Sequence, residues 1–399
     1  MAAHRARLAA ALLTAVLATA GSLPPAEAAG PATETLESVW MATPHVGHGI
    51  IVTQPANAAP TSRCLTSVAT TTDGGRSFAN PISVMTWLCG QAAGTPQLTF
   101  DGRGDGFVFG PQLFATHDAG LTWRRVAVAG TVIAVAARGR SVWALAESCR
   151  HSGRVAPARC PAFVITSSDG GRTWTRNHAL PPTLSVPAWL NLESALGQSL
   201  LVRPSGRLGL IVSVPRINPL GHPDAADLWT TTDGGATWTR RSLLCGIDAL
   251  SAMVTAVGRT WFGVCAGQPS AGFQAKSVAR STNGGRTWAL LDRCIPPSAG
   301  ACANPLDDGY LGVLVATTPR VVYESGLRSA LNVSHDGGRT WTATLEALAA
   351  DGDGITQLWM AGRHGLALSA PANRIAATSD GGARWHTAGV RLPATRLPA

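Results

Sequence analysis

The chain has 399 residues, of which 45% are hydrophobic and only 14% charged, and its formal net charge is +9. So many apolar residues exclude a disordered chain, and the 44 glycines and 26 prolines argue against long helices. The arginines are scattered rather than clustered, so the positive net charge is attributed first to a general preference for arginine in the composition. Attraction to an anionic surface or polymer is the second interpretation.

The first 28 residues have the features of a secretory signal peptide. Arg5 and Arg7 precede the apolar run 8–20, and Ala26-Glu27-Ala28 forms an A-x-A cleavage signal. The apolar run is shorter than the roughly 20 residues of a membrane-spanning helix. We therefore expect a signal peptide at 1–28, followed by a secreted chain over 29–399 without a membrane span.

One eight-residue pattern, S/T-x-D-G-G-x-T-W, recurs along the rest of the chain. Its seven copies span 71–78, 116–123, 167–174, 231–238, 281–288, 334–341 and 378–385. Their third positions are Asp73, Asp118, Asp169, Asp233, Asn283, Asp336 and Asp380. A period near 50 residues indicates a repeat architecture.

Short segments with strand character flank the copies, and turn-forming residues separate them. They include 141–145, 162–166, 208–214, 313–317 and 321–323, whereas 80–95 has the composition of a long loop. Four short strands in about 50 residues, repeated seven times, predict an all-β fold: a single seven-bladed β-propeller of four-stranded antiparallel blades.

The repeated octet resembles the Asp-box, or BNR repeat, of sialidase-like propellers. In that family the box is the tight turn between the third and fourth strands of a blade. The residue types suit such a turn, because a short carboxylate accepts backbone N–H bonds and glycine supplies a positive φ. Ala119 replaces the first glycine of the second box, which suggests that this position is the more permissive one. The closing aromatic residue of each box is expected to be buried between blades.

Eight cysteines in an exported chain predict four disulfides, with neighbours in sequence as the simplest pairing. The pairs are Cys64–Cys89, Cys149–Cys160, Cys245–Cys265 and Cys294–Cys302. The expected strand order places all eight on the face of the propeller opposite the Asp-box turns, here called the non-box face. Stapled loops on a rigid scaffold favour a binding surface there, although long exported loops also need stapling for stability alone.

Candidate binding residues on this face are aromatic or polar side chains near the expected channel. They are Trp87, Arg150, His151, Trp189, Arg216, His222 and Tyr310. No metal site is predicted, since His45 and His48 in PHVGHG have no further ligand fixed by spacing. No cofactor is expected, and no nucleotide-binding or catalytic fingerprint is present.

Two functions remain open. A sialidase-like glycoside hydrolase needs arginines around a tyrosine–glutamate pair, and the chain has only two tyrosines, Tyr310 and Tyr323. The second resemblance is to exported seven-bladed propellers of the photosystem II assembly-factor type, which implies binding and scaffolding. The sequence therefore predicts a secreted, monomeric, non-catalytic propeller that binds an unknown protein or glycan, but no nucleic acid.

Overall fold

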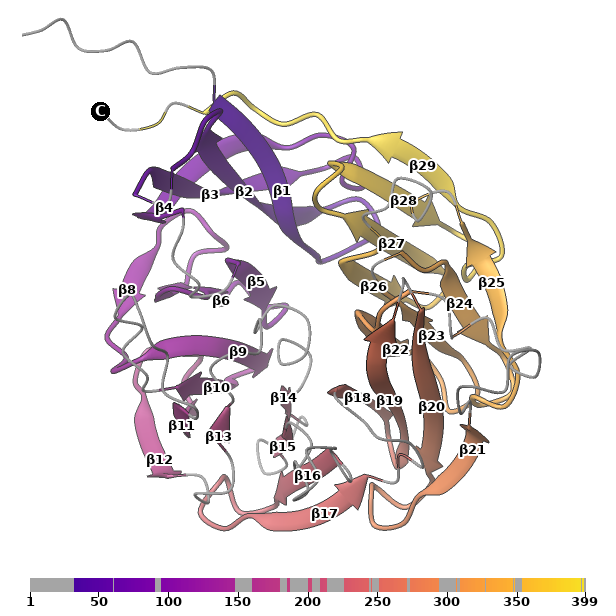
Figure 1. The fold of residues 1–399 in the computed structure, drawn as a ribbon. Coiled ribbons are helices and arrows are strands. Elements are labelled where there is room, and N and C mark those ends of the chain that lie inside the picture. Colours follow the sequence, from indigo (N-terminus) through magenta and orange to yellow (C-terminus); the bar gives the residue numbers. More distant parts are fainter. Residues whose placement is uncertain are drawn as a thin grey trace, which may run out of the picture.

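The computed structural model describes residues 32–59, 61–89, 95–147, 160–179, 185–186, 200–202, 209–213, 226–243, 245, 251–270, 273–293, 306, 309–326, 328–346, 348, 354–395 and 397. Within these ranges the regular structure consists of short β-strands grouped into small antiparallel sheets. The sheets are arranged around a ring (Figure 1). The prediction of an all-β propeller built from four-stranded antiparallel sheets is therefore confirmed.

The sheets follow one another along the chain, and the bounds of their strands are as follows. The first three comprise β1 (Ala32–Met41), β2 (Gly47–Pro55), β3 (Arg63–Thr71) and β4 (Ala79–Leu88); β5 (Gln97–Phe100), β6 (Gly106–Phe109), β7 (Leu113–Thr116) and β8 (Arg124–Val126); and β9 (Thr131–Arg138), β10 (Ser141–Glu147), β11 (Cys160–Ser167) and β12 (Thr175–Ala179). A short additional strand, β13 (Ser185–Val186), pairs with the start of β11.

The remaining sheets repeat the same antiparallel order. They comprise β14 (Leu200–Val202), β15 (Gly209–Ser213), β16 (Ala226–Thr231) and β17 (Thr239–Leu243); β18 (Ser251–Val257), β19 (Thr260–Ser270), β20 (Phe273–Ser281) and β21 (Ala289–Arg293); β22 (Val313–Ala316), β23 (Val322–Ser325), β24 (Leu331–Ser334) and β25 (Thr342–Leu345); and β26 (Gln357–Ala361), β27 (His364–Ser369), β28 (Arg374–Thr378) and β29 (His386–Gly389).

All five segments predicted as strands coincide with strands of the structure: β10, β11, β15, β22 and β23. The expected loop over 80–95 is wrong for its first half, because β4 runs to Leu88 and pairs with β3. The residues Asn80 and Pro81 at its start are typical of a turn. However, β4 is an outer strand whose first residues are exposed, and an edge strand tolerates proline.

The outer strand of a sheet is more exposed than the strands inside it. Every residue of β6 is buried, whereas in β8 of the same sheet none is. Buried side chains gather between neighbouring sheets: one core cluster joins Phe107 and Leu113 of one sheet to Val142 and Phe163 of the next. The hydrophobic core is therefore a ring of inter-sheet layers rather than a single centre. No helix in the described ranges is long and apolar enough to cross a membrane.

Contacts between sheets pass around the ring and return to the start. They run from β1 to β5, β5 to β9, β9 to β14, β15 to β18, β18 to β22, β22 to β26 and β26 back to β1. The seam is the junction of the first sheet (β1–β4) with the last (β26–β29). Here the Gln357 side chain accepts a bond from Val39 N at 2.7 Å, and that of Asn373 accepts one from Leu36 N at 2.7 Å.

The chain after β29 adds a second connection across the seam. It runs back beside the first sheet (Figure 1), where the Arg391 carbonyl accepts a bond from Phe78 N at 3.0 Å and Arg391 N donates to the Arg76 carbonyl at 2.9 Å. Thr395 N donates to Glu34 Oε1 at 3.2 Å. Side-chain and main-chain bonds therefore join the first and last sheets across the seam.

Candidate functional site

Each Asp-box forms the turn between the third and fourth strands of its sheet. In the box that joins β11 to β12, Asp169 Oδ1 accepts bonds from Ser167 Oγ at 2.7 Å and Thr173 N at 2.9 Å, and Oδ2 accepts one from Thr173 Oγ1 at 2.6 Å. Ser167 Oγ also accepts a bond from Gly171 N at 2.8 Å. The carboxylate thus organises its own turn.

The backbone bond to the third residue recurs in all seven boxes, whereas the bond from a hydroxyl to Oδ2 does not occur at Asn283, whose Nδ2 donates to Thr287, or at Asp380, where the residue four positions on is Arg384. The bond from the backbone N–H four residues on measures 2.9 Å at Asp73, Asp118, Asp169, Asp233 and Asp380, and 3.0 Å at Asn283 and Asp336. Bonds from the Thr122 side chain and backbone lower the pKa of Asp118 to about 2, and those from Thr173 lower the pKa of Asp169. These carboxylates are engaged as structural acceptors in their turns, so they are poor candidates for acid–base chemistry.

The two glycines of a box differ in what surrounds them. Ala119 adopts φ = 58°, so the first position keeps the left-handed conformation even without glycine. A Cβ added to the first glycine would have nothing within 4 Å at Gly234, whereas at Gly170 it would meet the end of the Asp105 side chain at 2.0 Å. A Cβ added to the second glycine meets a packed ring, as at Gly171, where Phe107 Cε1 would lie 2.5 Å away. The first position is therefore more permissive in space, as predicted, but it is not free of backbone strain.

The closing aromatic residues are less buried than predicted. Phe78 is 4% exposed and Trp341 8%, but the other five are only half-buried. Trp174 shows the reason: its ring meets Phe107 of the preceding sheet edge-on, with centroids 5.9 Å apart, while its Nε1 donates to the Gly171 carbonyl at 2.9 Å. One edge of the indole packs between sheets while the rest lies over the exposed turn.

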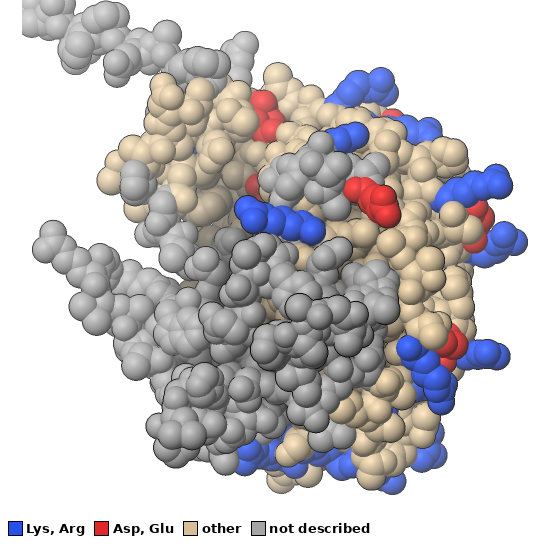
Figure 2. Space-filling model, turned by 45° about the vertical axis from the view of Figure 1, so that its right-hand side comes forward, with Lys and Arg blue, Asp and Glu red and all other residues tan. Residues whose placement is uncertain are grey.

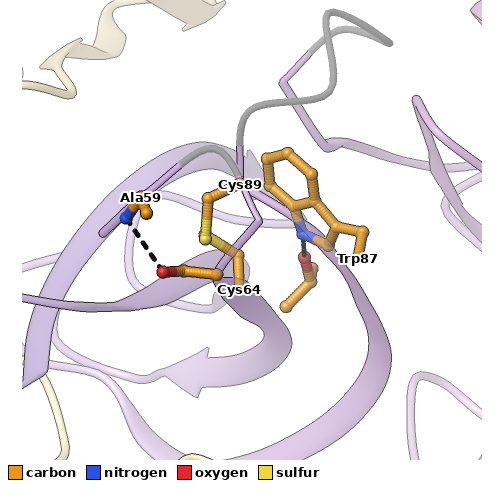
Figure 3. The surroundings of a disulfide bond; sticks show 6 residues. Ala59, Cys64, Trp87 and Cys89 are labelled. Carbon is orange, nitrogen blue, oxygen red and sulfur yellow. Dashed lines mark hydrogen bonds between the residues drawn. A yellow bond between two sulfur atoms is a disulfide. The ribbon is translucent and has the colours of Figure 1, made fainter. Parts of the chain in front are cut away.

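The opposite, non-box face is where each third strand begins and each fourth strand ends. Cys64, at the start of β3, is bonded to Cys89, just after β4, with Cα atoms 5.2 Å apart (Figure 3). Beside it the half-buried Trp87 donates its Nε1 to Thr66 Oγ1 at 3.0 Å. Ser62 accepts a bond from Cys89 N at 2.9 Å through its carbonyl. This corner of the first sheet is thus held by covalent and polar bonds.

A second disulfide lies on the same face. It joins Cys245, two residues after β17, to Cys265 in β19, and thereby ties one sheet to the next, with Cα atoms 5.5 Å apart. Both sulfur-bearing residues are buried, and Ser277 Oγ donates to the Cys245 carbonyl. The two disulfides coincide with two of the four predicted pairs, whereas Cys149 and the pair Cys294–Cys302 lie outside the described residues. Disulfides of this kind indicate an oxidising environment.

A buried lysine fixes the segment that leads to Tyr310. Lys276 is 2% exposed and donates its Nζ to the carbonyls of Leu306 and, at 3.1 Å, Gly309. Gln274, two residues earlier on β20, accepts a bond from Leu311 N at 2.9 Å. Neither residue was predicted as part of a site, although Lys276 stands out in the sequence as the only lysine of an arginine-rich chain.

The two tyrosines have different surroundings. Tyr310 is half-buried at the entrance to β22, and its carbonyl lies so close to Gly326 that a Cβ there would be 1.4 Å away. Tyr323 is 1% exposed, donates its hydroxyl to the Gly381 carbonyl at 2.8 Å, and has its pKa raised by burial. Tyr323 therefore belongs to the core between the last two sheets, and Tyr310 alone remains near the non-box face.

Two of the seven predicted binding residues, Trp87 and Tyr310, lie among the described residues. Trp87 lies on the outer strand of the first sheet, whereas Tyr310 precedes the first strand of another sheet, so the structure does not group them on one element. Arg150, His151, Trp189, Arg216 and His222 lie outside the described residues. In the described part of the chain no three His, Cys, Asp or Glu side chains are placed to hold a metal ion. Figure 2 shows arginines at several places on the face in view, with acidic side chains among them.

Comparison with known proteins agrees with this architecture. Among solved structures, YCF48 bound to D1 peptide matches with a TM-score of 0.52 and 18% identity over 86% of this chain and 92% of that one. YCF48 from Cyanidioschyzon merolae matches with a TM-score of 0.44 and 17% identity over 73% and 83%, and the GH74 enzyme of Niastella koreensis with 0.30 and 10% over 90% and 79%. At these identities the likeness concerns the fold alone.

A search of curated proteins finds no match. The family model described as BNR repeat-like domain matches residues 111–352, which is more than half of the chain. The matched region contains five of the seven Asp-boxes, from the second to the sixth. The chain therefore belongs to the BNR repeat-like domain family.

Proposed function

We propose that this protein is an exported, closed seven-bladed propeller that binds a partner through its non-box face and does not transform it. In this proposal residues 1–28 direct export and are removed, and residues 29–399 form the propeller, one blade around each Asp-box. The signal-peptide features of the sequence and the oxidising environment indicated by the disulfides support export.

The observation that carries the proposal is the reinforcement of the non-box face. Both described disulfides lie there, and the buried Lys276 and Gln274 fix the segment that leads to Tyr310. Cys89 and Cys245 lie just after the outer strands β4 and β17, and Gly309 and Leu311 lie just before β22, so these bonds fix the chain where it leaves or enters a sheet. A pre-organised surface loses less conformational entropy when it binds, which favours a recognition surface at this place.

We assign the partner to the class of extended protein segments, with a glycan as the second possibility. The solved YCF48 propeller is bound to a peptide, which supports a peptide on this fold by analogy only. Half-buried aromatic side chains such as Trp87 and Tyr310 suit either partner, because a flat ring contributes a large contact area with little conformational entropy.

The test is selection of binders from a random peptide library on the immobilised full-length protein, with a glycan array run on the same sample. Peptides or glycans that bind should lose at least tenfold in affinity when Tyr310→Ala or Trp87→Ala is introduced. The control is Arg286→Gln, an exposed change on the Asp-box face, which should leave the affinity unchanged. Binding that survives both aromatic substitutions would place the site elsewhere.

A hydrolysis assay on the same sample tests the alternative function, a sialidase-like glycoside hydrolase. Of the two tyrosines, Tyr323 is unsuited as a nucleophile because it is buried and its hydroxyl is bonded to Gly381. A hydrolase of this type would therefore depend on Tyr310. Hydrolysis of a fluorogenic sialoside that is abolished by Tyr310→Phe would refute a purely binding role, whereas binding without turnover supports it.

A further inference from the structure

A hollow of about 190 Å³ lies at the seam, on the Asp-box face and therefore opposite the non-box face. Its walls come from the β1–β2 turn, the first Asp-box and the last sheet. The lining residues that matter are His45, Arg76, Trp359, His364, Leu366 and His386. The first and last sheets thus each contribute side chains to one concave site.

The strand register explains why the ring is hollow at this junction. At most other junctions the residue of the second strand that pairs with the residue just before a box is aromatic, and two such rings meet the tryptophan of the next box: Phe107 meets Trp174 with centroids 5.9 Å apart, and Trp143 meets Trp238 at 6.2 Å. The sheet β14–β17 is an exception, with Leu210 at this position. Leu366 occupies this register position in the last sheet, where it pairs with Ala377.

The first box is also the one that does not close on tryptophan. Its closing residue, Phe78, is 4% exposed in the core cluster shared by the first and last sheets, where a Cβ added to Gly49 would lie 2.5 Å from Phe78 Cε1, and it is not among the residues that line the hollow. Two large rings meet at a junction such as that of Phe107 and Trp174, whereas the seam has Leu366 and the smaller, buried Phe78 at these positions. The hollow follows from these two substitutions rather than from loose packing of the ring.

Two side chains of opposite formal charge, Arg76 and Asp73, line the hollow, and they differ in what they can offer a ligand. Arg76 is exposed on the rim of the hollow and forms no ion pair with the residues that the structure describes. The carboxylate of Asp73, the acidic group among the lining residues, is engaged by Ser77 N at 2.9 Å and Ser77 Oγ at 2.6 Å in its own turn. Because the Asp73 oxygens are already bonded, Arg76 is the charged group that can contact a ligand in the hollow, and each of the three imidazoles carries at least one N–H donor, so an anionic group suits the hollow better than a cation.

The base of the hollow is apolar, with the half-buried Trp359 and the buried Leu366. A cavity of about 150 Å³ is large enough for benzene, so this hollow accepts one ring with a carboxylate attached. We propose that the seam hollow binds a small carboxylate whose body is a single ring, either an aromatic acid or a sugar acid. The carboxylate lies against Arg76 and the ring against Trp359. This site is separate from the non-box face.

The test uses isothermal titration calorimetry of the full-length protein with two acids and their neutral counterparts: benzoate with benzyl alcohol, and glucuronate with glucose. At least one acid should bind with a Kd below about 1 mM, and its neutral counterpart at least tenfold more weakly. The acid that binds identifies the body of the ligand. No binding by either acid, or equal binding of acid and neutral counterpart, would overturn the proposal.

Three variants locate the site. Arg76→Gln should weaken the acid at least tenfold, whereas the control Arg286→Gln, at the same position of another Asp-box, should not. Leu366→Phe, which introduces the aromatic side chain found at this position in most other sheets, should abolish binding. If that variant is misfolded by circular dichroism, Ser379→Trp at the exposed rim replaces it. If Leu366→Phe or Ser379→Trp is folded and binds the acid with unchanged affinity, the hollow is not the binding site. Peptide binding on the non-box face should persist in all of these variants.

Discussion

Two neighbouring glycines of the fifth Asp-box allow backbone strain and close packing to be separated. Gly284 and Gly285 have almost the same backbone conformation, with φ = 76° and 77°. A Cβ on Gly284 would meet nothing within 4 Å, whereas one on Gly285 would lie 2.6 Å from both Cε3 and Cζ3 of Trp261. Replacing each in turn by alanine therefore imposes the same φ penalty but very different contacts.

The magnitudes follow from these contacts. Alanine at positive φ destabilises the folded state by about 1–2 kcal/mol. Alanine also makes the unfolded chain less flexible, which stabilises the protein by about 0.4–1 kcal/mol, so Gly284→Ala should lower the free energy of unfolding by about 1 kcal/mol or less. Gly285→Ala adds the overpacking of a well-filled core, about 1–3 kcal/mol. Trp261 cannot move aside easily, because it is 2% exposed within a core cluster.

The assay is urea denaturation followed by circular dichroism, with the free energy of unfolding compared among the wild type and the two variants. We expect a total loss of about 1–4 kcal/mol for Gly285→Ala, at least about 1 kcal/mol more than for its neighbour. Equal losses in the two variants would refute the contact argument, and would show that backbone conformation alone selects both glycines.

Three further measurements test the Asp-box and the disulfides. Ala119→Gly should stabilise the protein by about 0.5 kcal/mol, because Ala119 is held at φ = 58°; a lower midpoint in urea would contradict this. Asp118, whose pKa is lowered to about 2 from 3.8 by the Thr122 bonds, contributes stability that is present above its unfolded pKa and lost as the pH falls from about 4 to 2. Acid unfolding of Asp118→Asn should therefore depend less steeply on pH in that window, and an unchanged profile would count against the role of the charge. Replacing both Cys64 and Cys89 by alanine opens a loop with a sequence separation of 25 and should cost about 3 kcal/mol, measured by urea denaturation; no loss would mean that the bonds around Ser62 suffice.

The candidate sites show where sequence reasoning reached its limit. Two disulfide pairs were predicted, because residues that are close in sequence and flank a hairpin are easily brought together. Lys276 was not recognised as a support of the Tyr310 segment, because its partners are the carbonyls of Leu306 and Gly309, which carry no side-chain signature. The seam hollow was also missed, since Arg76 and Leu366 are almost three hundred residues apart in sequence.

The sequence by itself determined the repeat, the strand order within each sheet and the position of every Asp-box turn. These features are local: a carboxylate, two glycines and a hydroxyl within eight residues form their hydrogen bonds with one another wherever the turn occurs. Only the tertiary structure decided how the ring closes, how deeply the closing tryptophans are buried and where the junctions are imperfectly filled. Those properties depend on side chains from different sheets, such as Leu366 and Phe78 at the seam, whose meeting is fixed by the register of strands far apart in the chain.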